Sequence, residues 1–300
     1  MYNTRAYSAT SPTSPLTPTS IPRRDPTDRD VQIEILFCGI CHSDLSLLNN
    51  DWGMTRYPFV PGHEATGRVV AMGNKAKGVS IGQRVGLGWN SHSCMHCKQC
   101  LMGHQNLCES LQPTLIGRHG AFANKVRAHW VWTMPLPEGL DSRESGPLLC
   151  GGITVFAPLR ELNISPTARV GVVGIGGLGH MALKFCKAWG CEVTAFTSSD
   201  SKAEEARAFG AHHVVSTGDS KAIEKLAEAD AFGSLGLSRR QALWQVLELD
   251  DAQLPLFGET CRVGTAHHDQ SQISDYKSQI KKDVTSKFFT RTKRTRSRGS

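Results

Sequence analysis

The sequence lacks any long apolar run, and this absence limits what the chain can be. No stretch of about 18 apolar residues occurs, so no transmembrane helix is predicted. The N-terminal stretch up to Pro22 is rich in Ser, Thr and Pro, without the apolar core of a signal peptide. We therefore expect a soluble protein of the reducing cytoplasm, whose ten cysteines are free thiols or metal ligands rather than disulfides.

Basic charge is scarce outside the C-terminal tail, although the formal net charge of the chain is +7. Residues 277–300 hold nine of the 34 Lys and Arg side chains and one of the 27 acidic ones, so the first 276 residues carry 25 basic and 26 acidic side chains. The tail has Phe288 and Phe289 side by side, not the interleaved aromatics of a base-stacking surface. We expect the tail to be disordered from about residue 270, and we expect neither nucleic acid nor a membrane as a partner.

A cysteine and a histidine in residues 37–64 have the chemistry of a metal site. Cys41 and His63 offer a thiolate and an imidazole, which zinc prefers as ligands. A catalytic zinc has three protein ligands and an open fourth position, and Cys150, in Gly-Pro-Leu-Leu-Cys-Gly-Gly, is our candidate for the third. Taken alone, a core thiol and an ordinary loop histidine would explain Cys41 and His63 equally well.

Polar side chains beside these two residues could assist chemistry. The hydroxyl of Ser43 could pass a proton, and the carboxylate of Asp44 could orient an imidazole. Glu64 places a second carboxylate beside His63. Cys38 lies three residues before Cys41, so a redox pair is an alternative, but we expect Cys38 to be a buried core thiol.

Four closely spaced cysteines predict a second metal site. Cys94, Cys97, Cys100 and Cys108 are separated by two, two and seven residues. Four thiolates so close in sequence form a closed tetrahedral zinc shell, which has no open position and therefore no chemistry of its own. Disulfides are the alternative, and the absence of a secretory signal makes them less favourable.

The residue pattern divides the chain into a β-rich part and a βαβ part. Residues 1–30 are turn-rich and predict no element, whereas residues 31–37 alternate apolar and polar side chains and predict a half-buried strand. Residues 67–85 indicate short strands broken by glycines, as in a small all-β domain. After Cys150, strands are predicted at 169–173, 192–196 and 212–215, with a helix over 180–189.

The strand at 169–173 runs directly into a glycine-rich loop. The loop reads G-x-G-x-x-G and comprises Gly174, Ile175, Gly176, Gly177, Leu178 and Gly179. Its glycines allow a tight turn and let the backbone approach a pyrophosphate at the N-terminus of the following helix. Because the required strand precedes it and a helix follows, we interpret it as a dinucleotide-binding loop, with a plain strand-to-helix turn as the alternative.

The strand at 192–196 has no acid at its end. An NAD site usually carries Asp or Glu there, to bind the 2′-hydroxyl of the ribose. This chain has Ser198 and Ser199 instead, with Lys202 close by and Asp200 further into the loop. Small hydroxyls and a lysine would accept a 2′-phosphate, so we predict NADP(H) as the cofactor.

Taken together, these motifs resemble the zinc-dependent medium-chain alcohol dehydrogenase family. The matching stretches are Cys-Gly-Ile-Cys-His-Ser-Asp-Leu, Pro-Gly-His-Glu, the four-cysteine segment, Gly-Pro-Leu-Leu-Cys-Gly-Gly-Ile-Thr-Val-Phe and Val-Gly-Ile-Gly-Gly-Leu-Gly-His, which cover about residues 30–229. Within that family the chain resembles the cinnamyl-alcohol-dehydrogenase group and its microbial NADPH aldehyde reductases. The implied fold is α/β, with a GroES-like β-rich catalytic domain over 1–150 and a partial Rossmann NADP-binding domain over 151–229.

The resemblance also implies which residues hold two zinc ions. One catalytic zinc would be held by Cys41, His63 and Cys150, and one structural zinc by the four-cysteine segment. Glu64 would lie near the catalytic ion, and Asp44 would fix the ring of His63.

Further roles implied by the resemblance concern the reaction. Ser43 would relay a proton, His42 would approach the cofactor pyrophosphate, and Thr154 would lie near the nicotinamide. Trp52 and Trp89 would border the substrate cleft, unless either is simple core. The implied reaction is the reversible reduction of an aldehyde to a primary alcohol by NADPH, so the expected partner is a small-molecule aldehyde or alcohol.

The resemblance ends after about Ala229, and residues 230–300 do not match the family pattern. We predict a helix over 221–228 and a short amphipathic helix over 241–249. Without the second half of the nucleotide sheet, the strand at 169–173 would be an edge strand. An oligomer is typical of the family but doubtful for this chain, and the alternative to an active enzyme is an inactive zinc- and nucleotide-binding remnant.

Overall fold

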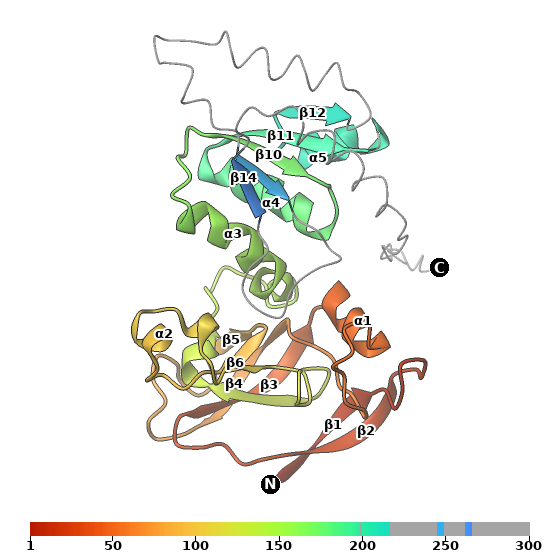
Figure 1. Ribbon diagram of the computed structural model, residues 1–300. Helices are drawn as coiled ribbons and strands as arrows, with labels where there is room; N and C mark the ends of the chain where they lie inside the picture. Colours follow the sequence, from red (N-terminus) through yellow and green to blue (C-terminus); the bar gives the residue numbers. More distant parts are fainter. Residues whose placement is uncertain (199, 217–244, 249–261, 266–300) are drawn as a thin grey trace, which may run out of the picture.

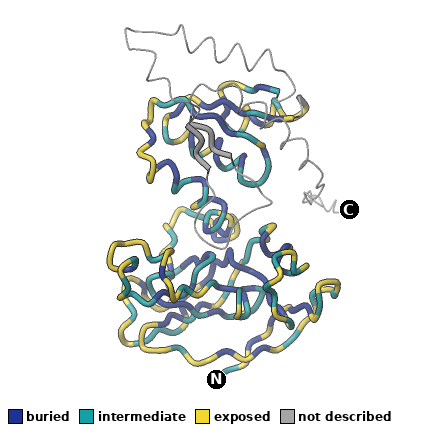
Figure 2. Tube along the Cα trace, in the orientation of Figure 1, coloured by how far each residue is buried: buried dark blue, intermediate teal, exposed yellow. Residues whose placement is uncertain are grey.

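The computed structural model describes residues 1–198, 200–216, 245–248 and 262–265, which form two parts (Figure 1). The first part contains β1 to β9, and the second contains α3 to β14. Each part has its own hydrophobic core, one around Val31, Ile33 and Val85 and one around Val170 and Leu183. Figure 2 shows buried residues along the sheets of both parts. In the described part of the chain, no helix is long and apolar enough to cross a membrane.

The chain begins with a hairpin that the sequence did not predict. Strands β1 (Tyr2–Ser8) and β2 (Thr17–Arg23) pair antiparallel, with Tyr2 opposite Arg23. Residues 1–30, whose turn-rich sequence was uninformative, therefore contain two paired strands. Proline can occupy β2 because a strand with a single partner leaves one edge on which the missing N–H costs no hydrogen bond. Ala6 and Ile21 then pack against Val60.

The main sheet of the first part has the strand order β8-β3-β4-β5-β9. It consists of β3 (Asp30–Cys38), β4 (Ala65–Met72), β5 (Arg84–Leu87), β8 (Lys125–His129) and β9 (Met134–Pro135). β3 confirms the strand predicted at 31–37, and β4 and β5 confirm the short strands predicted at 67–85. All paired neighbours in this sheet run antiparallel.

Shorter elements surround this sheet. They are β6 (Asn90–His92) paired with β7 (Gln112–Pro113), helices α1 (His42–Asn49) and α2 (Lys98–Leu101), and the 3-10 turns η1 (Gln105–Leu107), η2 (Trp130–Trp132) and η3 (Gly146–Leu149). Helix α1 follows directly from the end of β3, and η3 leads into the second part. These two junctions carry residues of the candidate site.

In the described residues, the second part is a sheet of order β12-β11-β10-β13-β14 with the helices α3, α4 and α5. Its strands are β10 (Arg169–Val173), β11 (Glu192–Thr197), β12 (His213–Ser216), β13 (Gln245–Glu248) and β14 (Arg262–Thr265). Its helices are α3 (Gly151–Glu161), α4 (Gly177–Trp189) and α5 (Ala203–Phe209), with the 3-10 turn η4 (Asp200–Lys202) before α5. The three strands predicted here are confirmed, and α4 begins three residues before the predicted helix because the last glycines of the loop form its first turn.

Strand β13 corrects two expectations. It pairs parallel with β10, Val170 lying opposite Gln245, so β10 is not an edge strand. The amphipathic helix predicted over 241–249 is wrong for residues 245–248, which form a strand. A pattern of only four apolar and polar residues fits a helix or a strand, and pairing with β10 selects the strand. Strand β14 then pairs antiparallel with β13. The helix predicted over 221–228 lies outside the described residues.

Candidate metal centre and coenzyme loop

The first turn of α1 positions Cys41 and Asp44. Cys41 is the N-cap residue of the helix, and its backbone N–H donates to Asp44 Oδ2 at 3.0 Å. A carboxylate three positions into a helix that accepts from the N-cap backbone is a capping-box contact, which fixes where the helix begins. The same contact holds the Asp44 side chain beside the Cys41 thiol.

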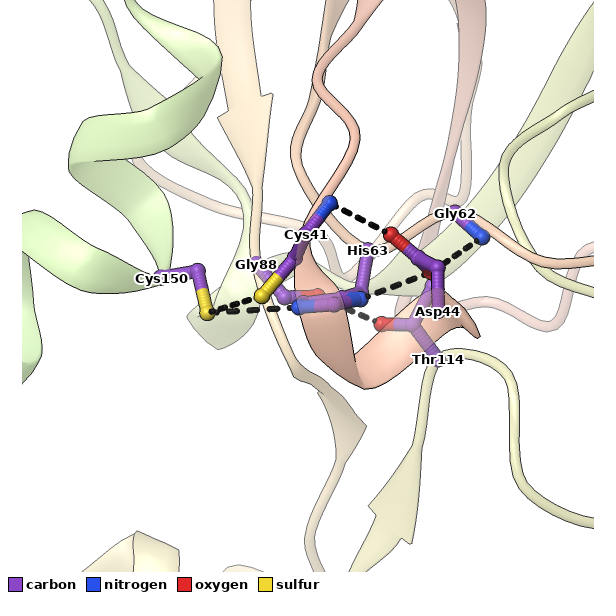
Figure 3. Close-up of polar contacts among 7 residues, drawn as sticks. All are labelled: Cys41, Asp44, Gly62, His63, Gly88, Thr114 and Cys150. Atoms are coloured by element: carbon purple, nitrogen blue, oxygen red, sulfur yellow. Dashed lines mark hydrogen bonds and ion pairs between the residues drawn. The ribbon is translucent and has the colours of Figure 1, made fainter. Parts of the chain in front are cut away.

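Asp44 connects this helix start to the Pro-Gly-His-Glu segment. Its Oδ1 lies 3.0 Å from His63 Nδ1 and accepts the backbone N–H of Gly62 at 2.8 Å (Figure 3). His63 is fully buried and Asp44 nearly so. With the carboxylate accepting from Nδ1–H, the opposite ring atom, Nε2, is free to bind a metal. The contact from Gly62 is one that the sequence did not predict.

Cys150 comes to this site from the junction of η3 and α3. Its Sγ lies 3.9 Å from Cys41 Sγ and 3.2 Å from His63 Nε2 (Figure 3). The potential ligand atoms of Cys41, His63, Glu64 and Cys150 all lie within 4.8 Å of one another. Two sulfurs, one imidazole nitrogen and one carboxylate oxygen converge on one point, and this donor set fits a zinc ion with an exchangeable position.

The protonation of these residues shows how strongly they interact. The contact with Cys150 lowers the pKa of Cys41 to about 4, although burial acts in the opposite direction and raises it. The same contact raises the pKa of Cys150. Burial lowers the pKa of His63, but the hydrogen bond and charge of Asp44 outweigh it and raise this pKa to about 10. Because metal ligands must be deprotonated, binding of a dication by Cys41, His63 and Cys150 would release protons from this site.

Glu64 lies directly against the backbone of Gly39. A Cβ at Gly39 would be 2.0 Å from Glu64 Oε2, so a side chain there would displace this carboxylate. Burial, followed by the negative charge of Cys41, raises the pKa of Glu64 to about 7. The glycine in Cys-Gly-Ile-Cys is thus a steric requirement of the site, which the sequence analysis did not recognise.

The other predicted residues of this site lie around the cluster. Ser43 is buried and points its backbone N–H at Cys41, and no side-chain partner of its hydroxyl is found among the described residues. His42 is exposed at the first position of α1. Thr154 Oγ1 donates to the carbonyl of Cys150 at 2.8 Å, one turn back in α3. Cys38 is a free thiol packed against the core of the main sheet, and burial raises its pKa to about 12.

Two tryptophans extend from His63. The ring of Trp89 meets the ring of His63 edge-on at 4.9 Å, and Trp52 meets Trp89 at 6.5 Å. Thr114 fixes the backbone of this wall: its N–H donates to Trp89 O and its Oγ1 to Gly88 O, each at 2.7 Å (Figure 3). Thr114 had no signal in the sequence, because its role depends on a contact across 25 residues.

The four-cysteine segment forms a second cluster. The thiols of Cys94, Cys97, Cys100 and Cys108 lie within 4.8 Å of one another. All four are free, and the sulfurs of Cys94 and Cys100 are 3.9 Å apart, so the disulfide alternative is wrong for this cluster. The backbone N–H groups of His96 and Cys97 lower the pKa of Cys94 to about 6, which favours the thiolate that a metal requires.

The glycine loop joins β10 to α4 with very little space. Gly174 has a positive φ of 80°, and a Cβ at Gly179 would lie 1.9 Å from the carbonyl oxygen of Gly174. The helix can therefore begin immediately after the strand only if Gly179 has no side chain. Gly176 is the N-cap, and Gly177, Leu178 and Gly179 form the first turn of the helix.

Lys202, one of the residues predicted to select the cofactor, lies beside this loop. Lys202 Nζ donates to the carbonyl of Ile175 at 3.4 Å, so its ammonium group reaches the glycine loop. Ser198 is exposed immediately after β11, and Ser199 lies outside the described residues. A lysine therefore reaches the loop, and an exposed serine follows β11 at the place where an NAD site has an acid.

Comparison with known proteins places the chain in a family. A model described as the alcohol dehydrogenase GroES-like domain matches residues 27–138, and one described as zinc-binding dehydrogenase matches residues 177–249. An aldehyde reductase, AdhA, of Synechocystis is 53% identical over 194 residues, which are 65% of this chain and 58% of that protein. NADP-dependent alcohol dehydrogenase C 1 of Mycolicibacterium smegmatis is 37% identical over 236 residues, 76% of this chain and 68% of that protein.

A solved structure shares the fold. The cinnamyl alcohol dehydrogenase of Sorghum bicolor superposes with a TM-score of 0.70 at 36% identity, over 75% of this chain and 67% of that one. The chain therefore belongs to the zinc-binding alcohol dehydrogenase family, and the α/β fold with GroES-like and Rossmann-type parts is confirmed. The zinc-binding dehydrogenase model extends past Ala229 to residue 249. The chain spans 58% of the length of the Synechocystis reductase.

Proposed function

We propose that this chain reduces aldehydes to primary alcohols, reversibly, with NADPH and a zinc ion held by Cys41, His63 and Cys150. The observation that carries the proposal is the convergence of these three side chains, from the two parts of the molecule, beside the buried carboxylate of Glu64. A zinc ion bound there supplies a Lewis acid that polarises a carbonyl group. Cys94, Cys97, Cys100 and Cys108 would hold a second, structural zinc.

The chain's own residues supply orientation and proton transfer. Asp44 fixes the His63 ring, and the first turn of α1 holds Asp44 in turn. Ser43, buried beside Cys41, is placed to pass a proton between substrate and solvent. Trp89 and Trp52 form an apolar wall next to His63, suited to the organic portion of an aldehyde.

The glycine loop would bind NADPH rather than NADH. Its N–H groups at the start of α4 suit a pyrophosphate, with His42 approaching from the first part and Thr154 near the nicotinamide. Ser198, Ser199 and Lys202 would receive the 2′-phosphate, where a carboxylate would repel it. This assignment divides the chain into a catalytic domain over 1–150 and a nucleotide-binding domain over 151–229. We place the reaction in the reducing cytoplasm, since the cysteines of both clusters are free thiols.

The test is aldehyde reduction by the zinc-loaded chain, followed through the loss of NADPH absorbance. Cys150→Ser should abolish turnover and remove one zinc ion, because the site loses a ligand. Cys191→Ser is the matched control, since Cys191 is a buried cysteine of the second part that belongs to neither cluster. Turnover by Cys150→Ser at the rate of the unaltered chain would contradict the proposal.

A second candidate is a protein that binds zinc and nucleotide without turnover. It is favoured by β14, which runs antiparallel, whereas the nucleotide sheet of this fold class continues with parallel strands. Misplacement of a cofactor by about 1 Å costs around a hundredfold in rate, so an altered sheet beside β10 could abolish catalysis. This candidate predicts two zinc ions and measurable NADPH binding without aldehyde reduction.

A further inference from the structure

Four arginines lie close together near the N-terminal hairpin, in segments that supply none of the candidate zinc ligands. Arg23 ends β2 and Arg24 follows it, Arg118 lies in the loop before β8, and Arg127 lies within β8. We call these four residues the arginine cluster. The resemblance and the comparisons with known proteins assign them no role.

The loop at residues 118–120 ties three of these arginines together. Arg23 donates from Nη1 to the carbonyl of His119 at 2.9 Å and from Nη2 to that of Gly120 at 2.7 Å. Arg118, in the same loop, donates from Nη2 to the carbonyl of Arg127 at 3.3 Å and from Nη1 to Ser91 Oγ. The guanidinium groups of Arg23 and Arg118 are therefore fixed by the folded backbone rather than free in solvent, and Arg127 joins the cluster through its backbone carbonyl.

Two donors of the cluster have no acceptor among the residues that the structure describes. Arg23 is only 6% exposed, and its Nε is buried without a hydrogen-bond partner. The Nε of Arg127 is buried and unpartnered in the same way. A buried N–H of a charged group without an acceptor is costly, so these two atoms indicate that an acceptor belongs beside them.

The positive charge of the cluster is also poorly neutralised. Asp30 is the carboxylate that acts on Arg118 and Arg127, and it already accepts from Arg24 Nη1 at 2.5 Å and from the N–H of Thr27 at 2.8 Å. Burial and then repulsion from neighbouring arginines lower the pKa of Arg23, Arg118 and Arg127 to about 10. Arg24, Arg118 and Arg127 thus share the carboxylate of Asp30.

We propose that the arginine cluster binds a small tetrahedral dianion of the phosphate or sulfate class. Guanidinium groups match such oxygens with paired N–H donors, and a dianion compensates more of the excess charge than a carboxylate can. The free Nε atoms of Arg23 and Arg127 supply the donors. This site is separate from the glycine loop, which lies in the second part of the molecule.

The experiment measures binding of inorganic phosphate to the zinc-loaded full chain by calorimetry, with sulfate, acetate and sodium chloride at equal ionic strength. Phosphate and sulfate should bind and acetate should not. Arg127→Gln should weaken phosphate binding about tenfold or more, the usual cost of losing a charge-assisted hydrogen bond. Arg68→Gln is the matched control, because Arg68 is an exposed arginine of strand β4 in the same sheet as β8.

Two further variants separate the possible origins of a phosphate signal. Lys202→Ala reports phosphate bound at the glycine loop, and the proposal requires that this variant keep its phosphate affinity. Arg127→Lys keeps the charge but not the paired donors, and it should be nearly as weak as Arg127→Gln. Loss of binding in Lys202→Ala alone, equal effects of phosphate and sodium chloride, or undiminished binding by Arg127→Gln would each overturn the proposal. Zinc content and circular dichroism check that every variant folds.

Discussion

Asp44→Asn tests whether His63 is a metal ligand held from behind by a carboxylate. The substitution keeps the shape of the side chain and changes one oxygen to an NH2 group. If Oδ1 continues to accept from His63 Nδ1 and from Gly62, the NH2 group takes the place of Oδ2 and faces the N–H of Cys41, at 3.0 Å in the native chain. Two donors then oppose each other at the start of α1.

The expected loss follows from these contacts. Removing a carboxylate behind a metal-binding histidine typically costs 10–100-fold in metal affinity, which is about 1.4–2.8 kcal/mol. Loss of the capping contact to Cys41 should lower the free energy of unfolding by about 1 kcal/mol. The four-cysteine cluster does not contact Asp44 in the described structure, so its affinity should not change.

The assay is a competition for zinc with a chromophoric chelator of graded affinity. We expect the unaltered chain to hold two zinc ions. In Asp44→Asn, a chelator whose affinity for zinc is 10–100-fold lower should be enough to remove one of the two. Asp51→Asn is the matched control, because Asp51 is exposed just beyond the end of α1. If Asp44→Asn keeps both ions as tightly as Asp51→Asn, Asp44 does not support a metal ligand and the site has been misinterpreted.

Three other predictions concern separate parts of the molecule. Cys97→Ser should reduce the zinc content from two ions to one and lower the thermal midpoint of unfolding, because a structural zinc contributes directly to folding. Elemental analysis measures the zinc content and calorimetry the midpoint, and unchanged values would refute the second zinc site. NADPH should bind more tightly than NADH in fluorescence titrations, and Ser198→Asp should reverse the order by repelling the 2′-phosphate; equal affinities in the unaltered chain would remove the argument. Gly179→Ala should abolish nucleotide binding, because its Cβ would lie 1.9 Å from the Gly174 oxygen, whereas Ala182→Gly in the same helix should not; nucleotide binding by Gly179→Ala would show that the loop can open.

The sequence was sufficient for those features whose signal lies within a short stretch. Strand β3 follows from the alternation in residues 31–37, and the loop between β10 and α4 follows from its glycines. Cys41, Asp44 and His63 could be selected because ligand chemistry and spacing are visible in single motifs. Cys150 is separated from Cys41 by 109 positions, and its selection rested on a motif rather than on any expected contact.

The features that were missed depend on contacts distant in sequence. The β1–β2 hairpin is stabilised by packing on Val60, so its prolines and turn residues gave no strand signal. Strand β13 owes its conformation to pairing with β10, which no local pattern in residues 241–249 could show. Gly39 and Thr114 act on Glu64 and Trp89 through tertiary contacts, and neither stands in a motif that reveals this.

The place of Cys150 at the start of α3 has a consequence for how the molecule unfolds. Helix α3 packs against α4 through Val155 and Leu159, so it belongs to the core of the second part, whereas Cys41 and His63 belong to the first. An ion bound to all three would cross-link two separate cores and couple their melting. The zinc-loaded chain should then unfold in one cooperative calorimetric transition. After a chelator has removed the zinc, the chain should unfold in two transitions, because the core of the second part is independent of the ligands in the first part and melts on its own.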